Sequence, residues 1–110
     1  MKDDRVYLDH ILLAIDRVLA YTTGGREEFL RNQMVQDAVA RNLEVISEAA
    51  KRLGETTKAR RPEIPWRRVA GLRDVLIHDY MAVDAQEVWN VVHSHLPALR
   101  AAVEALLRAD

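Results

Sequence analysis

Apolar residues recur at helical spacing along almost the whole chain, and this periodicity restricts the possible folds more than any other feature. Between Asp4 and Tyr21 they follow the repeat of an amphipathic helix, which Gly24-Gly25 ends. No window shows the alternation expected of a strand, so we predict an all-α protein. The apolar positions of this first helix are Val6, Ile11, Leu12, Ile15, Val18 and Leu19.

A second helical stretch is predicted from Arg26 to Leu53, with a break near Asn32 and a stop at Gly54. The polar, basic segment 55–65 follows, and its two prolines predict a loop. The positions predicted to face inward in the second stretch are Met34, Val35, Ala38, Val39, Leu43, Ile46, Ala50 and Leu53.

The last third of the chain predicts two or three more helices. Pro65 suits a first helical turn, where an N–H is not needed, so a helix is predicted over 65–81. Gly71 inside it costs roughly 1 kcal/mol relative to alanine, which a close contact with another helix would explain. Asp84-Ala-Gln-Glu87 resembles a capping box and starts a helix to about His95.

Pro97 then either kinks that helix or opens a final one to about Arg108, with Leu99, Val103, Leu106 and Leu107 facing inward. Short connections make the four main helices antiparallel. The predicted fold is therefore an antiparallel bundle of four to five helices, in one domain over residues 1–110.

Composition restricts the class of protein further. The chain has 110 residues and no cysteine, which excludes disulfides and thiolate metal sites and agrees with a cytoplasmic location. We expect no signal peptide and no membrane span, because the N-terminus is charged and no apolar run is long enough. The net charge is −1, yet residues 51–80 hold eight Lys and Arg against four Asp and Glu. Basic charge is thus concentrated in the third of the chain that contains the candidate site.

That site is the stretch Gly71-Leu-Arg-Asp-Val-Leu-Ile-His-Asp-Tyr80. Arg73 suits a phosphate, His78 exchanges a proton near neutral pH, and Tyr80 lies on the same helix face as Arg73. Asp74 lies four residues before His78 and can orient its imidazole. Because Arg73 and His78 diverge by about 140° around the helix axis, a second copy of the helix across a two-fold axis would complete the site more easily.

Spacing alone does not define this site, because Arg5 and His10 have the same spacing in the first helix. We assign that pair no chemistry, since the apolar run after His10 is typical of a core.

His93 and His95, two residues apart, make a poor metal pair, and we predict no metal site and no cofactor. Trp66 and Trp89 are interpreted as core or interface residues. A glycine-rich phosphate loop and an activated serine are both absent from the sequence.

Three segments together give the chain a close resemblance to the HepT-like toxins of the HEPN superfamily. They are Asn42-Leu-Glu-Val-Ile-Ser-Glu-Ala-Ala-Lys51, Pro62-Glu-Ile-Pro-Trp66 and the stretch from Gly71 to Tyr80. The family's Arg-x-x-x-x-His-x-Tyr motif is matched by Arg73, His78 and Tyr80. Asp74 departs from the asparagine common in the family.

The resemblance implies a homodimeric, metal-independent endoribonuclease, the toxin of a type II/VII-like toxin–antitoxin system, in which Arg73 and His78 are catalytic and Asp74 supports them. It implies an RNA substrate such as tRNA or mRNA, and we take the nearby arginines as candidate RNA contacts. It also implies a small MntA-like nucleotidyltransferase antitoxin that attaches AMP to Tyr80. The candidate RNA contacts are Arg60, Arg61, Arg67 and Arg68.

A second hypothesis keeps the same bundle and dimer without the catalysis. The chain would then be a nucleotide- or substrate-binding module that partners a nucleotidyltransferase. The net charge of −1 and the presence of Asp74 favour this hypothesis slightly. The complete set of Arg73, His78 and Tyr80 favours the ribonuclease more strongly.

Overall fold

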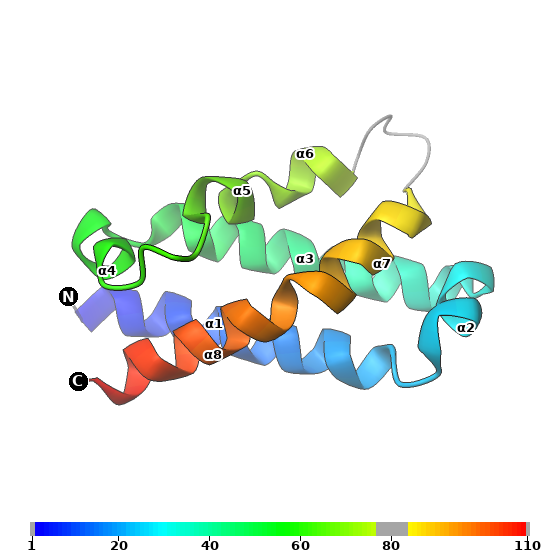
Figure 1. Cartoon of the computed structure of the whole chain (residues 1–110), viewed down its shortest axis with the longest axis horizontal. Coiled ribbons are helices and arrows are strands. Elements are labelled where there is room, and N and C mark those ends of the chain that lie inside the picture. Colours follow the sequence, from blue (N-terminus) through cyan, green and yellow to red (C-terminus); the bar gives the residue numbers. More distant parts are fainter. Residues whose placement is uncertain (1, 77–83, 110) are drawn as a thin grey trace.

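Four helical walls run alternately in opposite directions along the long axis of the molecule (Figure 1). The structure, a computed structural model, describes residues 2–76 and 84–109. Two walls are single helices, α1 (Lys2–Tyr21) and α3 (Gln33–Arg52). The third consists of α5 (Trp66–Ala70) and α6 (Leu72–Leu76), and the fourth of α7 (Ala85–Ser94) and α8 (Leu96–Arg108). No strand occurs in these residues, so the predicted all-α bundle is confirmed.

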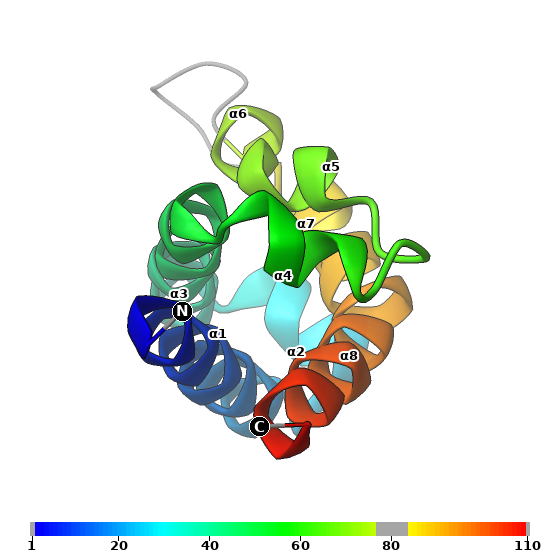
Figure 2. The same cartoon turned by 90° about the vertical axis from the view of Figure 1, so that its left-hand side faces the viewer.

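Two short helices, α2 (Gly25–Arg31) and α4 (Glu55–Ala59), lie at opposite ends of the bundle (Figure 1). The end-on view shows α1 between α3 and α8, with α5 and α6 on the other side of the core (Figure 2). The prediction of a loop over 55–65 is wrong for α4. This helix owes its place to a tertiary contact, because buried Asp4 of α1 accepts hydrogen bonds from the Thr57 hydroxyl and from the Gly54 N–H, the latter at 3.3 Å.

The core forms where the apolar faces of α1 and α3 meet those of the other walls. Most positions predicted to face inward are buried or half-buried, but Val6 is 50% exposed and Met34 is 76% exposed. Met34 lies seven residues before the exposed Arg41, so it belongs to the solvent face of α3. The largest fully buried side chains that α1 and α3 contribute are Ile11, Ile15, Val18, Val39, Leu43 and Ile46.

Polar side chains fix two of the predicted helix ends. The Asn32 N–H donates to the Phe29 carbonyl, and its side-chain oxygen accepts from the Val35 N–H at 3.1 Å, so one residue ends α2 and caps α3. Asp84 caps α7 in the same way by accepting from the Glu87 N–H at 3.1 Å. Pro97 lies in the first turn of α8, so it opens that helix.

The helix predicted over 65–81 is interrupted at Gly71, where φ is −94° and ψ is 8°. A Cβ at Gly71 would lie 3.4 Å from the carbonyl oxygen of Arg67 and 3.7 Å from that of Arg68. Both atoms belong to the preceding turn, so within the described residues no other helix comes this close to Gly71 itself. Gly71 instead marks the change of direction from α5 to α6.

Surface charges also join the walls. Arg100 of α8 forms an ion pair with Asp16 of α1, with a distance of 2.7 Å from Nε to Oδ1. The hydrogen bond from Arg100 to Asp16 raises the pKa of the guanidinium, which therefore stays charged. None of the helices in the described part of the chain is long and apolar enough to cross a membrane.

Candidate functional site

Helix α6 carries Arg73 and Asp74 of the predicted site. Leu72 is only 8% exposed and holds the start of the helix against the core, whereas the next two side chains face solvent. Among the described residues, neither Arg73 nor Asp74 has an ion pair or a side-chain hydrogen bond. No contact within this part of the chain has to break before the Arg73 guanidinium binds an external anion.

His78 and Tyr80 belong to the segment 77–83, which lies outside the described residues. Three relationships consequently stay predictions: the pairing of Asp74 with His78, the angular offset between Arg73 and His78, and the shared face of Arg73 and Tyr80.

The second pair with this spacing, Arg5 and His10, has a different environment. A guanidinium nitrogen of Arg5 donates to the main-chain carbonyl of Leu107 at 3.0 Å, which connects the start of α1 to the end of α8. His10 is exposed and forms a T-shaped ring pair with Tyr7, with 6.4 Å between ring centroids. Arg5 therefore has a structural partner, whereas Arg73 has none within residues 2–76 and 84–109.

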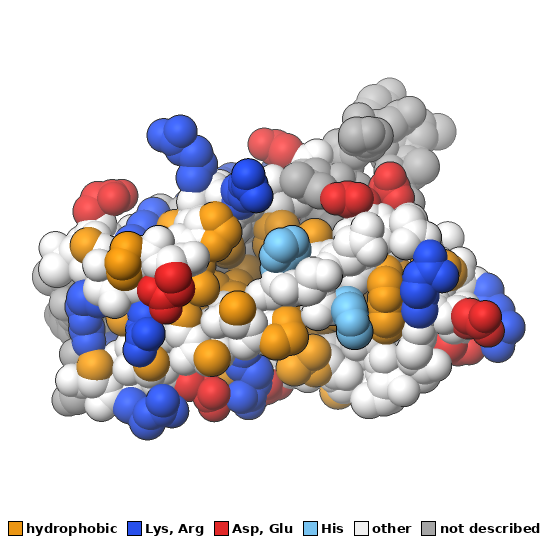
Figure 3. Space-filling model, in the orientation of Figure 1, with side chains coloured by type: hydrophobic (Ala, Val, Ile, Leu, Met, Phe, Trp, Pro, Cys, Tyr) orange, Lys and Arg blue, Asp and Glu red, His pale blue; other side chains and the backbone are white. Residues whose placement is uncertain are grey.

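The four arginines predicted to contact RNA do not form one uniform group. Arg67 and Arg68 are exposed on α5, directly before the helix of Arg73. Arg61 is half-buried and pairs with Glu63 at 3.2 Å, while Arg60 is exposed just after α4. Basic side chains project from the surface over α5 (Figure 3). Of the four candidates, Arg67 and Arg68 on α5 are therefore the two nearest to Arg73 along the chain.

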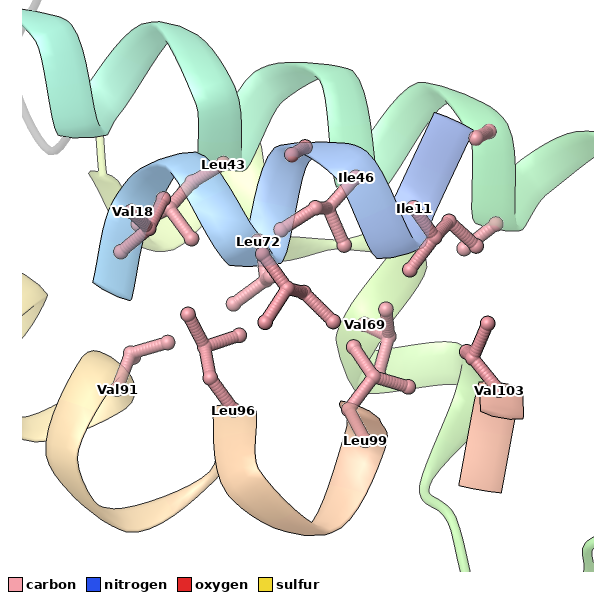
Figure 4. Close-up of a cluster of buried hydrophobic side chains, with 14 of the residues drawn as sticks. Ile11, Val18, Leu43, Ile46, Val69, Leu72, Val91, Leu96, Leu99 and Val103 are labelled. Carbon is pink, nitrogen blue, oxygen red and sulfur yellow. The ribbon is translucent and has the colours of Figure 1, made fainter. Parts of the chain in front are cut away.

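An apolar cleft of about 480 Å³ lies between the segment 63–72 and the wall formed by α7 and α8. Val69 and Leu72 face Val91, Leu96 and Leu99 across this region (Figure 4). Figure 3 shows hydrophobic side chains gathered in a hollow of the same face, with a histidine close by. The cleft adjoins the Gly71 break, so it lies next to the helix that carries Arg73.

Charged and polar side chains border this cleft. Arg68 and Glu63 come from the side of α5, whereas Glu87, Ser94 and His95 come from the opposite wall. The cleft is not predicted from the sequence, which indicates only that His95 would make a poor metal pair with His93. The helical spacing of Val91, Leu96 and Leu99 predicts an inward face, and all three are buried. It does not predict that a cleft remains between this face and the segment 63–72.

The histidine of α7, His93, has a separate role. His93 stacks on the ring of Trp89, with 6.0 Å between centroids and 12° between planes. The Trp89 ring also packs near the buried ring of Phe29 in α2, with 5.6 Å between centroids, which agrees with its predicted packing role. The residues that the structure describes contain no group of three or more His, Asp or Glu side chains arranged to hold a metal ion.

The fold and the exposed Arg73 define a small helical-bundle protein with a cationic side chain beside an apolar cleft. Residues 11–106 match the family described as Ribonuclease HepT-like, and the chain belongs to this family. The resemblance inferred from the three sequence segments is therefore confirmed.

Curated relatives span nearly the whole chain. A protein of Thermococcus cleftensis named "Probable ribonuclease HepT" is 41% identical over 101 residues, covering 91% of this chain and 92% of its own length. A protein of Caldanaerobacter subterraneus subsp. tengcongensis named "Putative RNase TTE0752" is 32% identical over 111 residues, covering 100% and 99% of the two chains. No solved structure matches the chain.

Proposed function

We propose that this protein is a metal-independent endoribonuclease that acts in the cytoplasm as the toxin of a toxin–antitoxin pair. Its membership of the HepT-like ribonuclease family supports ribonuclease chemistry. The observation that carries the proposal for this chain is the exposed guanidinium of Arg73, which has no partner among the described residues. An exposed guanidinium on α6, the helix at the start of the Arg-x-x-x-x-His-x-Tyr motif, suits the phosphate of an RNA backbone.

In the proposed reaction the 2′-oxygen of a ribose attacks the adjacent phosphorus and the bond from phosphorus to the 5′-oxygen breaks. His78 removes the 2′ proton or protonates the leaving 5′-oxygen. Arg73 stabilises the charge that develops on the phosphoryl oxygens. The products are a 2′,3′-cyclic phosphate and a 5′-hydroxyl, and the internal nucleophile makes a metal-activated water unnecessary. Asp74 supports the site by orienting His78.

We further propose that two copies pair through the apolar cleft. The cleft adjoins α6, so pairing there would bring the two motif helices together. Its border carries charges of both signs, Arg68 on one side and Glu87 on the other. A two-fold interface brings one patch against itself, and such a mixed border can be complementary to its own copy. A composite site would thus contain residues from both subunits.

The proposed regulator is a small MntA-like nucleotidyltransferase that attaches AMP to Tyr80. A phosphodiester on Tyr80 would place negative charge on the face of Arg73 and compete with the substrate phosphate. Co-expression of the two proteins should add AMP to the wild-type chain, detected by mass spectrometry, and leave Tyr80→Phe unmodified. Modification of both proteins to the same extent would exclude Tyr80 as the acceptor.

RNA cleavage in the presence of EDTA is the direct test. We expect wild-type protein to cut RNA, and Arg73→Ala and His78→Ala to lose cutting and growth arrest. Arg5→Ala and His10→Ala are matched controls, because that pair has the same spacing but lies on α1. Retained cleavage in both motif variants would reject the proposed site. RNA or nucleotide binding without cleavage by the wild-type chain would favour the non-catalytic module instead.

A further inference from the structure

Ser47 connects α3 to the break that precedes the helix of Arg73. Its side chain is only 2% exposed, and its hydroxyl donates to the main-chain carbonyl of Ala70 at 2.5 Å. A helical serine usually bonds to a carbonyl of its own preceding turn. This hydroxyl instead bonds to another wall of the bundle, 23 residues further along the chain.

The Ala70 carbonyl needs this partner because it lies at the end of α5. In a continuous helix this carbonyl would accept a hydrogen bond from the N–H of Asp74. That N–H donates instead to the carbonyl of Gly71, at 3.0 Å. A carbonyl at a helix end that is packed against protein is costly when nothing bonds to it. The Ser47 hydroxyl supplies the missing donor, so the interruption can pack directly against α3.

The same interruption sets the direction of α6. Immediately after it, Leu72 is buried while Arg73 and Asp74 face solvent. If Ala70 and Asp74 regained a helical bond, α5 and α6 would join and Arg73 would point elsewhere. We propose that Ser47 is a positioning residue, whose hydroxyl holds the α5–α6 break and so aims Arg73 at the substrate phosphate. The catalytic part of this proposal rests on the proposed ribonuclease function.

Two variants on the same helix separate positioning from stability. Ser47→Ala removes the donor, whereas the matched control Ile46→Val removes one methyl group from the neighbouring, fully buried residue. Both are assayed well below their unfolding temperatures. We expect Ser47→Ala to lower kcat about tenfold or more with little change in KM, since small errors in placement act on the transition state. Ile46→Val should keep the wild-type kcat, and an equal loss of kcat in both would overturn the positioning role.

Amide hydrogen exchange tests the anchoring without any RNA. In Ser47→Ala, peptides covering residues 66–76 should exchange faster than in wild type, with a smaller change in α1 and α8. Exchange over 66–76 that equals that of Ile46→Val would overturn the proposal. If the wild-type chain cuts no RNA, the ribonuclease proposal fails, and the exchange comparison alone decides whether Ser47 holds the helix of Arg73.

Discussion

The indole nitrogen of Trp66 donates a hydrogen bond to the main-chain carbonyl of Arg61 at 3.0 Å. It also lies 3.2 Å from the carbonyl oxygen of Lys58, near the end of α4. The Trp66 ring is 7% exposed, so its packing and its polar edge together hold the turn after α4 against the start of α5. Trp66 therefore holds the basic segment 58–61 against α5, the helix before α6.

Replacing Trp66 with phenylalanine tests this polar contact. The ring stays apolar, but the indole hydrogen bonds are lost while the Lys58 and Arg61 carbonyls keep main-chain N–H donors. We therefore expect the free energy of unfolding to fall by about 0.5–1.5 kcal/mol. Trp89→Phe is the matched control, because Trp89 makes ring contacts with Phe29 and His93. Denaturant unfolding at one fixed protein concentration measures both. A loss for Trp89→Phe as large as that for Trp66→Phe would show that the indole hydrogen bonds contribute little.

The features predicted correctly from the sequence are those that depend on local chemistry. Asn32 and Asp84 cap helices through main-chain groups a few residues away, so nearby sequence is enough to locate them. Helix α4 depends on Asp4, which is 50 or more residues distant in the chain. The prediction that Met34 faces inward is wrong, because a methionine in a first helical turn satisfies an apolar pattern without a neighbour to cover it.

The same distinction between local features and features that depend on distant residues applies to the candidate site. The exposure of Arg73 agrees with its predicted role in binding an anion. The local sequence does not predict that Arg73 has no partner among the described residues. It also does not predict the break at Gly71, which follows a carbonyl that accepts a hydrogen bond from Ser47 of another helix. The apolar cleft likewise arises from the meeting of segments that are distant in sequence, around Val69 and around Leu96.

Removing the Asp4 carboxylate should destabilise the end of the bundle near α4. Asp4→Ala removes the acceptor of the Gly54 N–H and of the buried Thr57 hydroxyl, which costs about 1–3 kcal/mol of unfolding free energy. Asp9→Ala on the exposed face of the same helix should change it by less than about 0.5 kcal/mol. Equal effects of the two substitutions in chemical denaturation would contradict the buried contact.

Two glycines should respond oppositely to alanine. Gly25 has a φ of +90° and free space around a Cβ, so Gly25→Ala should lose roughly 1–2 kcal/mol from backbone strain alone. Gly71 has a negative φ, and its nearest contact at 3.4 Å is an ordinary one, so Gly71→Ala should gain about 0.4–1 kcal/mol. Thermal and denaturant unfolding measure both changes. A loss at Gly71 as large as that at Gly25 would mean that the break needs glycine.

Arg67 and Arg68 are expected to bind RNA phosphates without taking part in the chemistry. Binding is best measured on the His78→Ala background, where the proposed general acid–base is absent and the RNA stays intact. Each substitution to alanine should weaken binding and reduce the slope of log affinity against log salt concentration by about 0.7, the value for one phosphate contact on a single strand. Arg17→Ala is the charge-matched control, because Arg17 is also exposed but lies on α1. If all three variants lose affinity to the same extent, net charge governs binding and α5 contains no specific RNA contact.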